Sequence, residues 1–175
     1  MLRIERGMVA EQELHVAVIC TGNICRSPMA EVVLNQLVMD DPSLASRVLV
    51  SSAGTARWHV GSPMDPRARA ALDRAGFRGP GTLGAFADTK YLDAQDLIVV
   101  MTREHFSDVR DRLSSGRTKI VLLRDVLDPD LLLDVPDPYY GSHEDFDACV
   151  ALFRQAGQRL TAEFRRRLDA YSREV

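Results

Sequence analysis

The sequence is poor in cysteine and has no long apolar run. Its three cysteines are odd in number and lack the spacing of a disulfide framework, so we expect a reduced, cytoplasmic protein. No stretch approaches the roughly 18 apolar residues of a membrane-spanning helix, and no secretory signal is recognisable. Cytoplasmic localisation is the expectation, with export in the absence of a signal left open.

Two further scarcities narrow the function. The four histidines are scattered, and none pairs with a cysteine or carboxylate at ligand spacing, so we expect no metal and no cofactor. The net charge is only −3, without the basic excess typical of proteins that bind nucleic acid or membrane surfaces. We therefore expect neither as a partner.

What is present is an ordinary globular composition, with 46% hydrophobic and 27% charged residues. A chain of 175 residues suits one domain with a full core. Residues 1–12 are polar and patternless and are predicted to be a disordered extension. Residues 13–175 are predicted to form a single domain.

Buried-type strands alternate with amphipathic helices along the chain. Strands are predicted at residues 14–19, 48–54, 96–101 and 119–123, and helices at 29–38, 66–75, 103–113 and after the loop of residues 134–140. Such alternation favours an α/β fold with a parallel, doubly wound, four-stranded sheet and helices on both faces, in three layers. Ligands of such sheets bind beyond the carboxyl ends of the strands.

The most informative segment, residues 20–27, reads CTGNICRS. It joins a predicted strand to a predicted helix, where unpaired N–H groups and the positive end of the helix dipole converge. Gly22 and Asn23 are predicted to adopt positive φ, which turns successive N–H groups inward toward an anion. The planar guanidinium of Arg26 can hold two phosphate oxygens. The segment is therefore predicted to bind a phosphate group.

Cys20 begins this segment and is the candidate nucleophile. The positive field favours its thiolate at neutral pH, and the Ser27 hydroxyl can donate to the sulfur. A cysteine and an arginine six positions apart arise easily by chance, and a buried cysteine after a strand is usually core. The ordered context of strand, Gly/Asn loop, Arg-Ser-Pro and helix favours the functional interpretation.

Thiolate attack on a phosphate monoester needs a proton donor for the departing oxygen. Asp137 is the best candidate, because it lies in a proline-stiffened loop after the last strand and hence near the same sheet edge. Asp-Pro pairs are more often turn signals, and Asp65 and Asp128 also precede prolines. Spacing alone does not choose among the three aspartates.

Four motifs together resemble a known family. They are CTGNICRSPMAE at 20–31, SAGT at 52–55, WHVG at 58–61 and DPYY at 137–140. The chain resembles the low-molecular-weight protein tyrosine phosphatases, most of all their actinobacterial members, over residues 14–165 and with the motifs in family order. The resemblance implies a phosphotyrosine phosphatase I-like fold with flavodoxin-like strand order.

The resemblance also implies roles for individual residues. Cys20 would form a cysteinyl phosphate, Arg26 would clamp the phosphate, and Asp137 would act as general acid and then base. The remaining loop positions would bind the phosphate or hold the loop; they are Thr21, Gly22, Asn23, Ile24, Cys25 and Ser27. An aromatic slot suited to a phenyl ring would be walled by Trp58, His59, Tyr139 and Tyr140. For Trp58, half-buried packing is the alternative.

Two cysteines besides the nucleophile need an interpretation. In the family, a cysteine at the position of Cys25 can form a reversible disulfide with the nucleophile and protect it from overoxidation. A small buried filler is an equally good interpretation of Cys25. Cys149, on the apolar face of the last predicted helix, is expected in the core.

Three positions depart from the family pattern. Ala75-Gly76 stands where members commonly have His-Gly, residues 82–86 lack a usual His or Arg, and Thr102 replaces an aspartate that often follows the third strand. These positions usually support the phosphate loop by hydrogen bonds. We therefore expect a less firmly held loop with all reacting groups retained.

Three other functions fit parts of the same pattern. Thioredoxin-coupled arsenate reductases share the fold but need further cysteines, and none lies between residues 26 and 148. Protein-arginine phosphatases also have this fold, but they typically carry threonine in place of Ile24 and lack the paired tyrosines. Tyrosine phosphate is therefore the preferred substrate, and protein-arginine phosphatase is the alternative. A non-catalytic phosphotyrosine-binding module would lack Cys20 or Asp137. The expected partners are a phosphotyrosine protein substrate and a tyrosine kinase.

Overall fold

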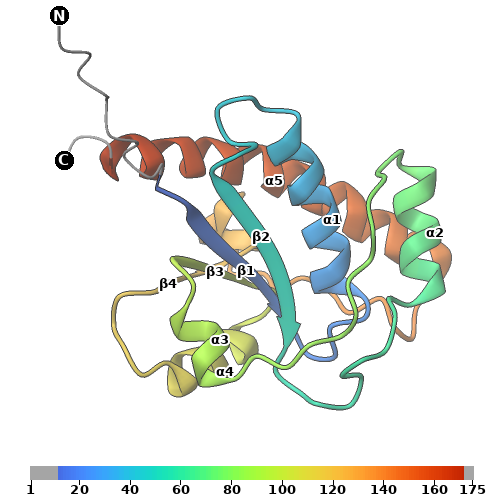
Figure 1. Ribbon diagram of the computed structural model, residues 1–175. Helices are drawn as coiled ribbons and strands as arrows, with labels where there is room; N and C mark the ends of the chain where they lie inside the picture. Colours follow the sequence, from blue (N-terminus) through green and yellow to red (C-terminus); the bar gives the residue numbers. More distant parts are fainter. Residues whose placement is uncertain (1–11, 172–175) are drawn as a thin grey trace, which may run out of the picture.

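In the computed structural model, residues 12–171 are described, and they include one four-stranded parallel sheet (Figure 1). Its strands are β1 (Leu14–Cys20), β2 (Val48–Gly54), β3 (Leu97–Val100) and β4 (Lys119–Leu122), in the order β2-β1-β3-β4. All three strand pairs are parallel. The predicted sheet and its flavodoxin-like order are confirmed.

Helices cover both faces of the sheet, which gives the predicted three layers (Figure 1). One face carries α1 (Arg26–Met39), α2 (Pro66–Arg74) and α5 (His143–Tyr171), and the other carries α3 (Thr89–Asp93) and α4 (Arg103–Arg112). The alternation of β1 explains the division, since Val16 and Val18 face the first layer and Ala17 and Ile19 the second. Both layers bury apolar side chains completely, so both faces of the sheet are core.

Several boundaries differ from the predictions. Helix α1 begins at Arg26, three residues early, so Pro28 lies in its first turn, where no N–H is needed. The short helix α3, capped by the side chain of Asp88, was not predicted. Two 3₁₀ helices, η1 (Arg124–Val126) and η2 (Pro129–Leu131), lie in what was predicted as loop. The proposed extension at 1–12 lies outside the described residues except for Gln12.

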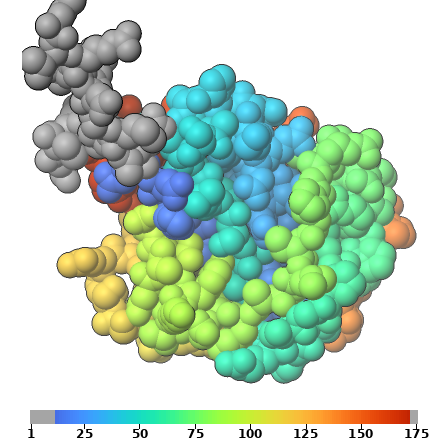
Figure 2. All heavy atoms as spheres, viewed as in Figure 1, coloured from blue at the N-terminus to red at the C-terminus, as the bar shows by residue number. Residues whose placement is uncertain are grey.

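Three segments that are distant in sequence meet at the carboxyl ends of β1, β2 and β3. The loop after β1 ends at α1, and residues 82–87 cross the end of β2, where Gly54 bridges Phe86. In Figure 2 the yellow-green surface of this part of the chain lies beside the teal surface of the segment that follows β2. The loop after η2 returns to the same edge because the Val135 N–H donates to the Met101 carbonyl. None of the helices within residues 12–171 is long and apolar enough to cross a membrane.

Candidate active site

A cavity of about 230 Å³ opens at this edge of the sheet. Its lining comes from the loop after β1, the loop after β2 and the loop before α5: Cys20, Thr21, Gly22, Ile24, Cys25, Arg26, Trp58, His59, Asp137, Tyr139 and Tyr140. The structure therefore places every predicted site residue in the cavity wall, with the exception of Asn23 and Ser27. Those two are buried and lie behind the wall, against the sulfur of Cys20.

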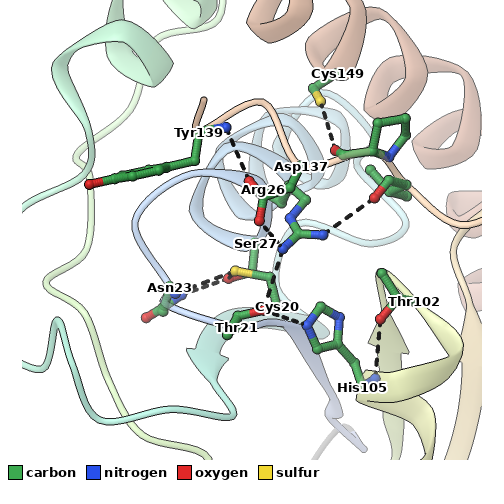
Figure 3. A network of polar contacts seen from close by, with 12 residues as sticks. Cys20, Thr21, Asn23, Arg26, Ser27, Thr102, His105, Asp137, Tyr139 and Cys149 are labelled. Atoms are coloured by element: carbon green, nitrogen blue, oxygen red, sulfur yellow. Dashed lines mark hydrogen bonds and ion pairs between the residues drawn. The ribbon is translucent and has the colours of Figure 1, made fainter. Parts of the chain in front are cut away.

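The Cys20 thiol lies at the base of the cavity with two polar neighbours (Figure 3). The side chain is only 3% exposed. The Asn23 N–H donates to Cys20 Sγ at 3.3 Å, and Ser27 Oγ lies 3.0 Å from the same sulfur. Both neighbours offer hydrogens that stabilise a thiolate more than a thiol.

The side chain of Asn23 positions the Ser27 hydroxyl beside the sulfur. Its Oδ1 accepts from the Ala85 N–H at 2.8 Å, so its Nδ2 must face the hydroxyls. Nδ2 donates to Ser27 Oγ and to Ser52 Oγ, each at 2.8 Å. Because Asn23 fills one lone pair of Ser27 Oγ, the Ser27 hydrogen is left for Cys20 Sγ at 3.0 Å or for the Ala53 carbonyl at 3.4 Å, and a thiolate, which can only accept, draws it to the sulfur. Asn23 therefore holds Ser27 where it can donate to the sulfur.

The backbone of the loop partly contradicts the prediction. Asn23 has the predicted positive φ, at 56°. Gly22 does not, and that prediction was wrong. Gly22 instead makes a close approach, since a Cβ there would lie 2.9 Å from Cδ2 of His59 and the imidazole ring would have to shift. Gly54 in β2 is likewise needed, because a Cβ there would collide with the Thr21 carbonyl oxygen.

A buried carboxyl group that sequence reasoning missed completes this side of the loop. Ser52 Oγ donates to Glu31 Oε2 at 2.5 Å, and Thr82 Oγ1 donates to the same oxygen at 3.0 Å. Burial raises the pKa of Glu31, although both hydroxyl bonds act in the opposite direction. Glu31 looked like an ordinary helix glutamate in sequence, and only its place on the inner face of α1 would have indicated burial.

Arg26 and Asp137 both line the cavity, and their side chains are in contact (Figure 3). Arg26 Nη2 donates to Asp137 Oδ2 at 2.5 Å, and Nη1 donates to the Val135 carbonyl at 3.3 Å. The two competing aspartates serve as caps instead. Asp65 caps α2 and pairs with Arg67, and Asp128 caps η2. Of these three aspartates, Asp137 alone lines the cavity.

The other side of the loop contacts a histidine that had no predicted role. Nε2 of His105, in the first turn of α4, lies 2.8 Å from Thr21 Oγ1. Arg26 Nη2 donates to the same hydroxyl at 3.4 Å. Burial, and then the positive charge of Arg26, lower the pKa of His105 to about 4. A scattered histidine of this kind carries no local signal in the sequence.

The rim of the cavity is aromatic and exposed. Trp58 is 78% exposed, so the alternative of half-buried packing was wrong. Tyr139 and Tyr140 meet edge to face with their centroids 4.9 Å apart, and Tyr140 is 96% exposed. The guanidinium of Arg67 lies 5.5 Å from the Tyr139 ring. Base and rim thus differ sharply in burial.

All three cysteines are buried and free. Burial raises the pKa of Cys25 to about 12 and that of Cys149 to about 11, so both are thiols at neutral pH. Cys149 packs in the core as expected and lies near the Pro136 carbonyl. For Cys25, the disulfide and the buried filler both remain predictions.

The three departures from the family pattern have visible consequences. Ala75 is the C-cap of α2 and Gly76 follows at φ 82°, so this pair ends a helix. Within residues 82–86, the Ala85 N–H and the Thr82 hydroxyl take part in the network behind the sulfur. Thr102 caps α4 by accepting from the His105 N–H at 3.2 Å. The phosphate loop is therefore braced by groups other than the expected ones.

Comparisons with known proteins agree with this geometry. The family model described as "Low molecular weight phosphotyrosine protein phosphatase" matches residues 15–170. The "Low molecular weight protein-tyrosine phosphatase A" of Mycobacterium tuberculosis is 40% identical over 144 residues, covering 82% of this chain and 86% of the relative. The "Low molecular weight protein-tyrosine-phosphatase" of Streptomyces coelicolor is 37% identical over 159 residues, covering 88% and 95%.

Solved structures give the same result. The crystal structure of YfkJ from Bacillus subtilis superimposes with a TM-score of 0.79 at 31% identity, covering 89% of this chain and 97% of that one. Vibrio vulnificus Wzb, solved in complex with benzylphosphonate, superimposes with a TM-score of 0.73 at 27% identity, covering 86% and 99%. The chain belongs to the low molecular weight phosphotyrosine protein phosphatase family and is of the actinobacterial type.

Proposed function

We propose that this enzyme hydrolyses protein phosphotyrosine through a cysteinyl-phosphate intermediate on Cys20. One observation carries the proposal: a sulfur with two hydrogen-bond donors lies at the base of a cavity that Arg26 and Asp137 also line. A nucleophile, an anion clamp and a carboxyl group are the three parts that phosphomonoester transfer to a thiolate requires.

In the first step, the Cys20 thiolate attacks phosphorus and the bond from phosphorus to the phenolic oxygen breaks. Arg26 and the N–H groups of the loop hold the phosphoryl oxygens. The Arg26–Asp137 contact opens when the phosphate competes for the guanidinium. The released Asp137 carboxylate takes up a proton from the monoanionic phosphate ester or from solvent and then donates it to the leaving oxygen. Tyrosine leaves with its hydroxyl group restored.

In the second step, water attacks the phosphocysteine and gives a proton to the Asp137 carboxylate. The S–P bond breaks, and the electron pair returns to sulfur. The Ser27 hydroxyl and the Asn23 N–H stabilise the departing thiolate. Phosphate is released and the starting protonation states are restored.

The walls of the cavity favour an aryl phosphate. Aromatic side chains stand on both sides of the mouth, and Ile24 offers an apolar surface beside the nucleophile. A phosphoarginine would have to bury its guanidinium against Ile24, whose apolar side chain offers no hydrogen-bond acceptor. The proposed partners are therefore a phosphotyrosine protein in the cytoplasm and the tyrosine kinase that modifies it.

The decisive test is a parallel assay on matched phosphotyrosine and phosphoarginine peptides. We expect the phosphotyrosine peptide to be hydrolysed faster, with activity unchanged in EDTA. Cys20→Ser should lower kcat by about 10⁴-fold or more, because the nucleophile is lost. Preference for phosphoarginine would assign the alternative function, and activity in Cys20→Ser or its loss in EDTA would reject the mechanism.

Asp137 is tested by varying the leaving group. Asp137→Ala should slow a phosphotyrosine peptide by about 100-fold or more, because its phenolic oxygen needs the proton. The loss on p-nitrophenyl phosphate should be much smaller, since nitrophenolate leaves without protonation. Asp128→Ala, an exposed Asp-Pro aspartate, is the matched control. Equal losses on both substrates would assign the acid role to another group.

A further inference from the structure

We propose that the Thr21 hydroxyl is an additional hydrogen-bond donor to the bound phosphoryl group, and that His105 is the positioning residue that aims it. This inference rests on the proposed function, because it concerns the same cavity. Sequence reasoning gave His105 no role, and it lies on a different element from the phosphate loop.

Two nitrogen atoms crowd around one oxygen, the Oγ1 of Thr21 (Figure 3). Thr21 lines the cavity, and its Oγ1 lies 2.8 Å from His105 Nε2 and 3.4 Å from Arg26 Nη2. A hydroxyl group has one hydrogen to donate and two lone pairs to accept with. The direction of the hydroxyl hydrogen therefore depends on whether His105 Nε2 donates or accepts.

The surroundings of His105 decide which ring nitrogen carries its proton. The side chain is 3% exposed, and its Nδ1 is buried with no hydrogen-bond partner among the described residues. The imidazole is neutral near pH 7, with its pKa lowered to about 4, so it carries a single N–H. An unpaired buried N–H is rarer and costlier than an unpaired lone pair. The proton therefore belongs on Nε2, which donates to Thr21.

With this tautomer, His105 and Arg26 both donate to Thr21 and occupy its lone pairs. The hydroxyl hydrogen then has neither of them as an acceptor and turns into the cavity that Thr21 lines. A phosphoryl oxygen bound there receives it. A hydroxyl whose lone pairs are engaged is also a stronger donor, because chains of hydrogen bonds polarise one another.

The surroundings of His105 hold this arrangement in place. Its backbone N–H is tied to the Thr102 hydroxyl at the start of α4. The charged groups that act on its ring are Arg26, which disfavours protonation, and the more weakly acting Asp108, Asp137 and Asp134, which favour it. The net effect leaves the ring neutral at the pH of the cytoplasm.

The kinetic test uses four variants of the full chain. Thr21→Val removes the hydroxyl at nearly constant shape, and Thr21→Ser keeps it. His105→Leu removes the donor, and His105→Gln restores an amide N–H near the position of Nε2. For p-nitrophenyl phosphate we expect Thr21→Val and His105→Leu each to lower kcat by about 10-fold, less than the loss of a principal oxyanion donor, because Arg26 and the N–H groups of the loop still hold the phosphoryl oxygens. The inhibition constant of inorganic phosphate should rise in both.

Because His105 acts through Thr21, the two losses should not add. The double variant should be no slower than either single variant, and Thr21→Ser and His105→Gln should recover most of the activity. Unchanged kcat in Thr21→Val, or losses that multiply in the double variant, would overturn the inference. If His105→Leu fails to fold, the comparison of Thr21→Val with Thr21→Ser alone tests whether the hydroxyl acts on the phosphoryl group.

Nitrogen-15 NMR of the wild-type imidazole gives a second, independent measurement. We expect the chemical shifts of the Nε2–H tautomer near pH 7, and the Nδ1–H tautomer would overturn the inference. This readout also separates the two proposals. A wild-type enzyme that hydrolyses no phosphotyrosine would reject the proposed function, whereas the tautomer and the phosphate inhibition constant would still report on Thr21 and His105.

Discussion

The phosphate loop is braced on its two flanks by different chemistry. On the β2 flank, Asn23 connects the nucleophile to Ser52 and the buried Glu31 through short hydrogen bonds. On the α4 flank, a single hydroxyl, Thr21, connects the loop to a buried histidine. One flank ends in a carboxyl group with a raised pKa, and the other in an imidazole with a lowered pKa.

This difference separates two tasks. The β2 flank positions the hydroxyl of Ser27 and therefore acts on the sulfur. The α4 flank contacts Thr21, which accepts from Arg26, and therefore acts on the phosphate clamp. Disruption of the first flank should mainly affect the nucleophile, whereas disruption of the second should mainly affect phosphate binding and the transition state.

The largest effect is expected at Asn23. Asn23→Gly keeps the freedom for positive φ but removes the three side-chain bonds, so the Ser27 hydroxyl is no longer held beside the sulfur. We expect kcat to fall by about 100-fold, the size of the loss of an oriented donor. The free energy of unfolding should fall by about 2–3 kcal/mol, because buried polar groups lose partners.

Ser52→Ala is the matched control for Asn23→Gly. It removes one partner of Asn23 but leaves the bonds to Ser27 and to the Ala85 N–H, so its effect on kcat should be several times smaller. Steady-state kinetics and urea unfolding of both variants measure the difference. Equal losses in the two variants would show that Asn23 does not act through Ser27.

The contrast between the flanks also explains how much the sequence could predict. The loop from Cys20 to Ser27 was predictable, because a strand, a turn and a helix cap are local features with their own residue signals. The partners of this loop come from distant segments. Whether Glu31 or His105 is buried depends on how α1 and α4 pack, and no local pattern encodes that.

The Gly22 error has the same origin. A glycine in a loop indicates either positive φ or close approach, and only the tertiary contact with His59 distinguishes them. The choice among Asp65, Asp128 and Asp137 likewise needed the course of the chain after η2. Predictions held where the cause was local, and they failed or stayed open where two loops met.

A smaller effect is expected from the titration of His105. Its pKa of about 4 lies below the ordinary value of 6.5, so the unfolded chain binds the proton more readily between these limits. The free energy of unfolding should therefore fall as the pH drops from about 6.5 to about 4, by on the order of 3 kcal/mol. His105→Gln should lack this slope in urea unfolding at pH 7 and pH 4.5.

Thr21→Val is the control for that experiment, because it removes the hydrogen bond but keeps the titrating imidazole. We expect it to retain the dependence on pH while losing stability at both pH values. A His105→Gln variant with the same slope as the wild type would mean that another group carries the titration.

The smallest expected effect belongs to Glu31, and its sign is opposite. Its raised pKa means that the folded chain holds the proton more tightly than the unfolded chain above the ordinary value of 4.5, so stability is lost as the pH rises through the folded pKa. The hydroxyls of Ser52 and Thr82 offset part of the effect of burial on the pKa, which keeps this change in stability below that of His105.

Glu31→Gln removes the charge but keeps an oxygen for both hydroxyls. It should therefore be more stable relative to the wild type at pH 8 than at pH 5. Because the two slopes oppose each other above pH 4.5, Glu31→Gln should also steepen the slope that remains from His105. A flatter profile in Glu31→Gln would mean that the two flanks do not titrate in opposite directions.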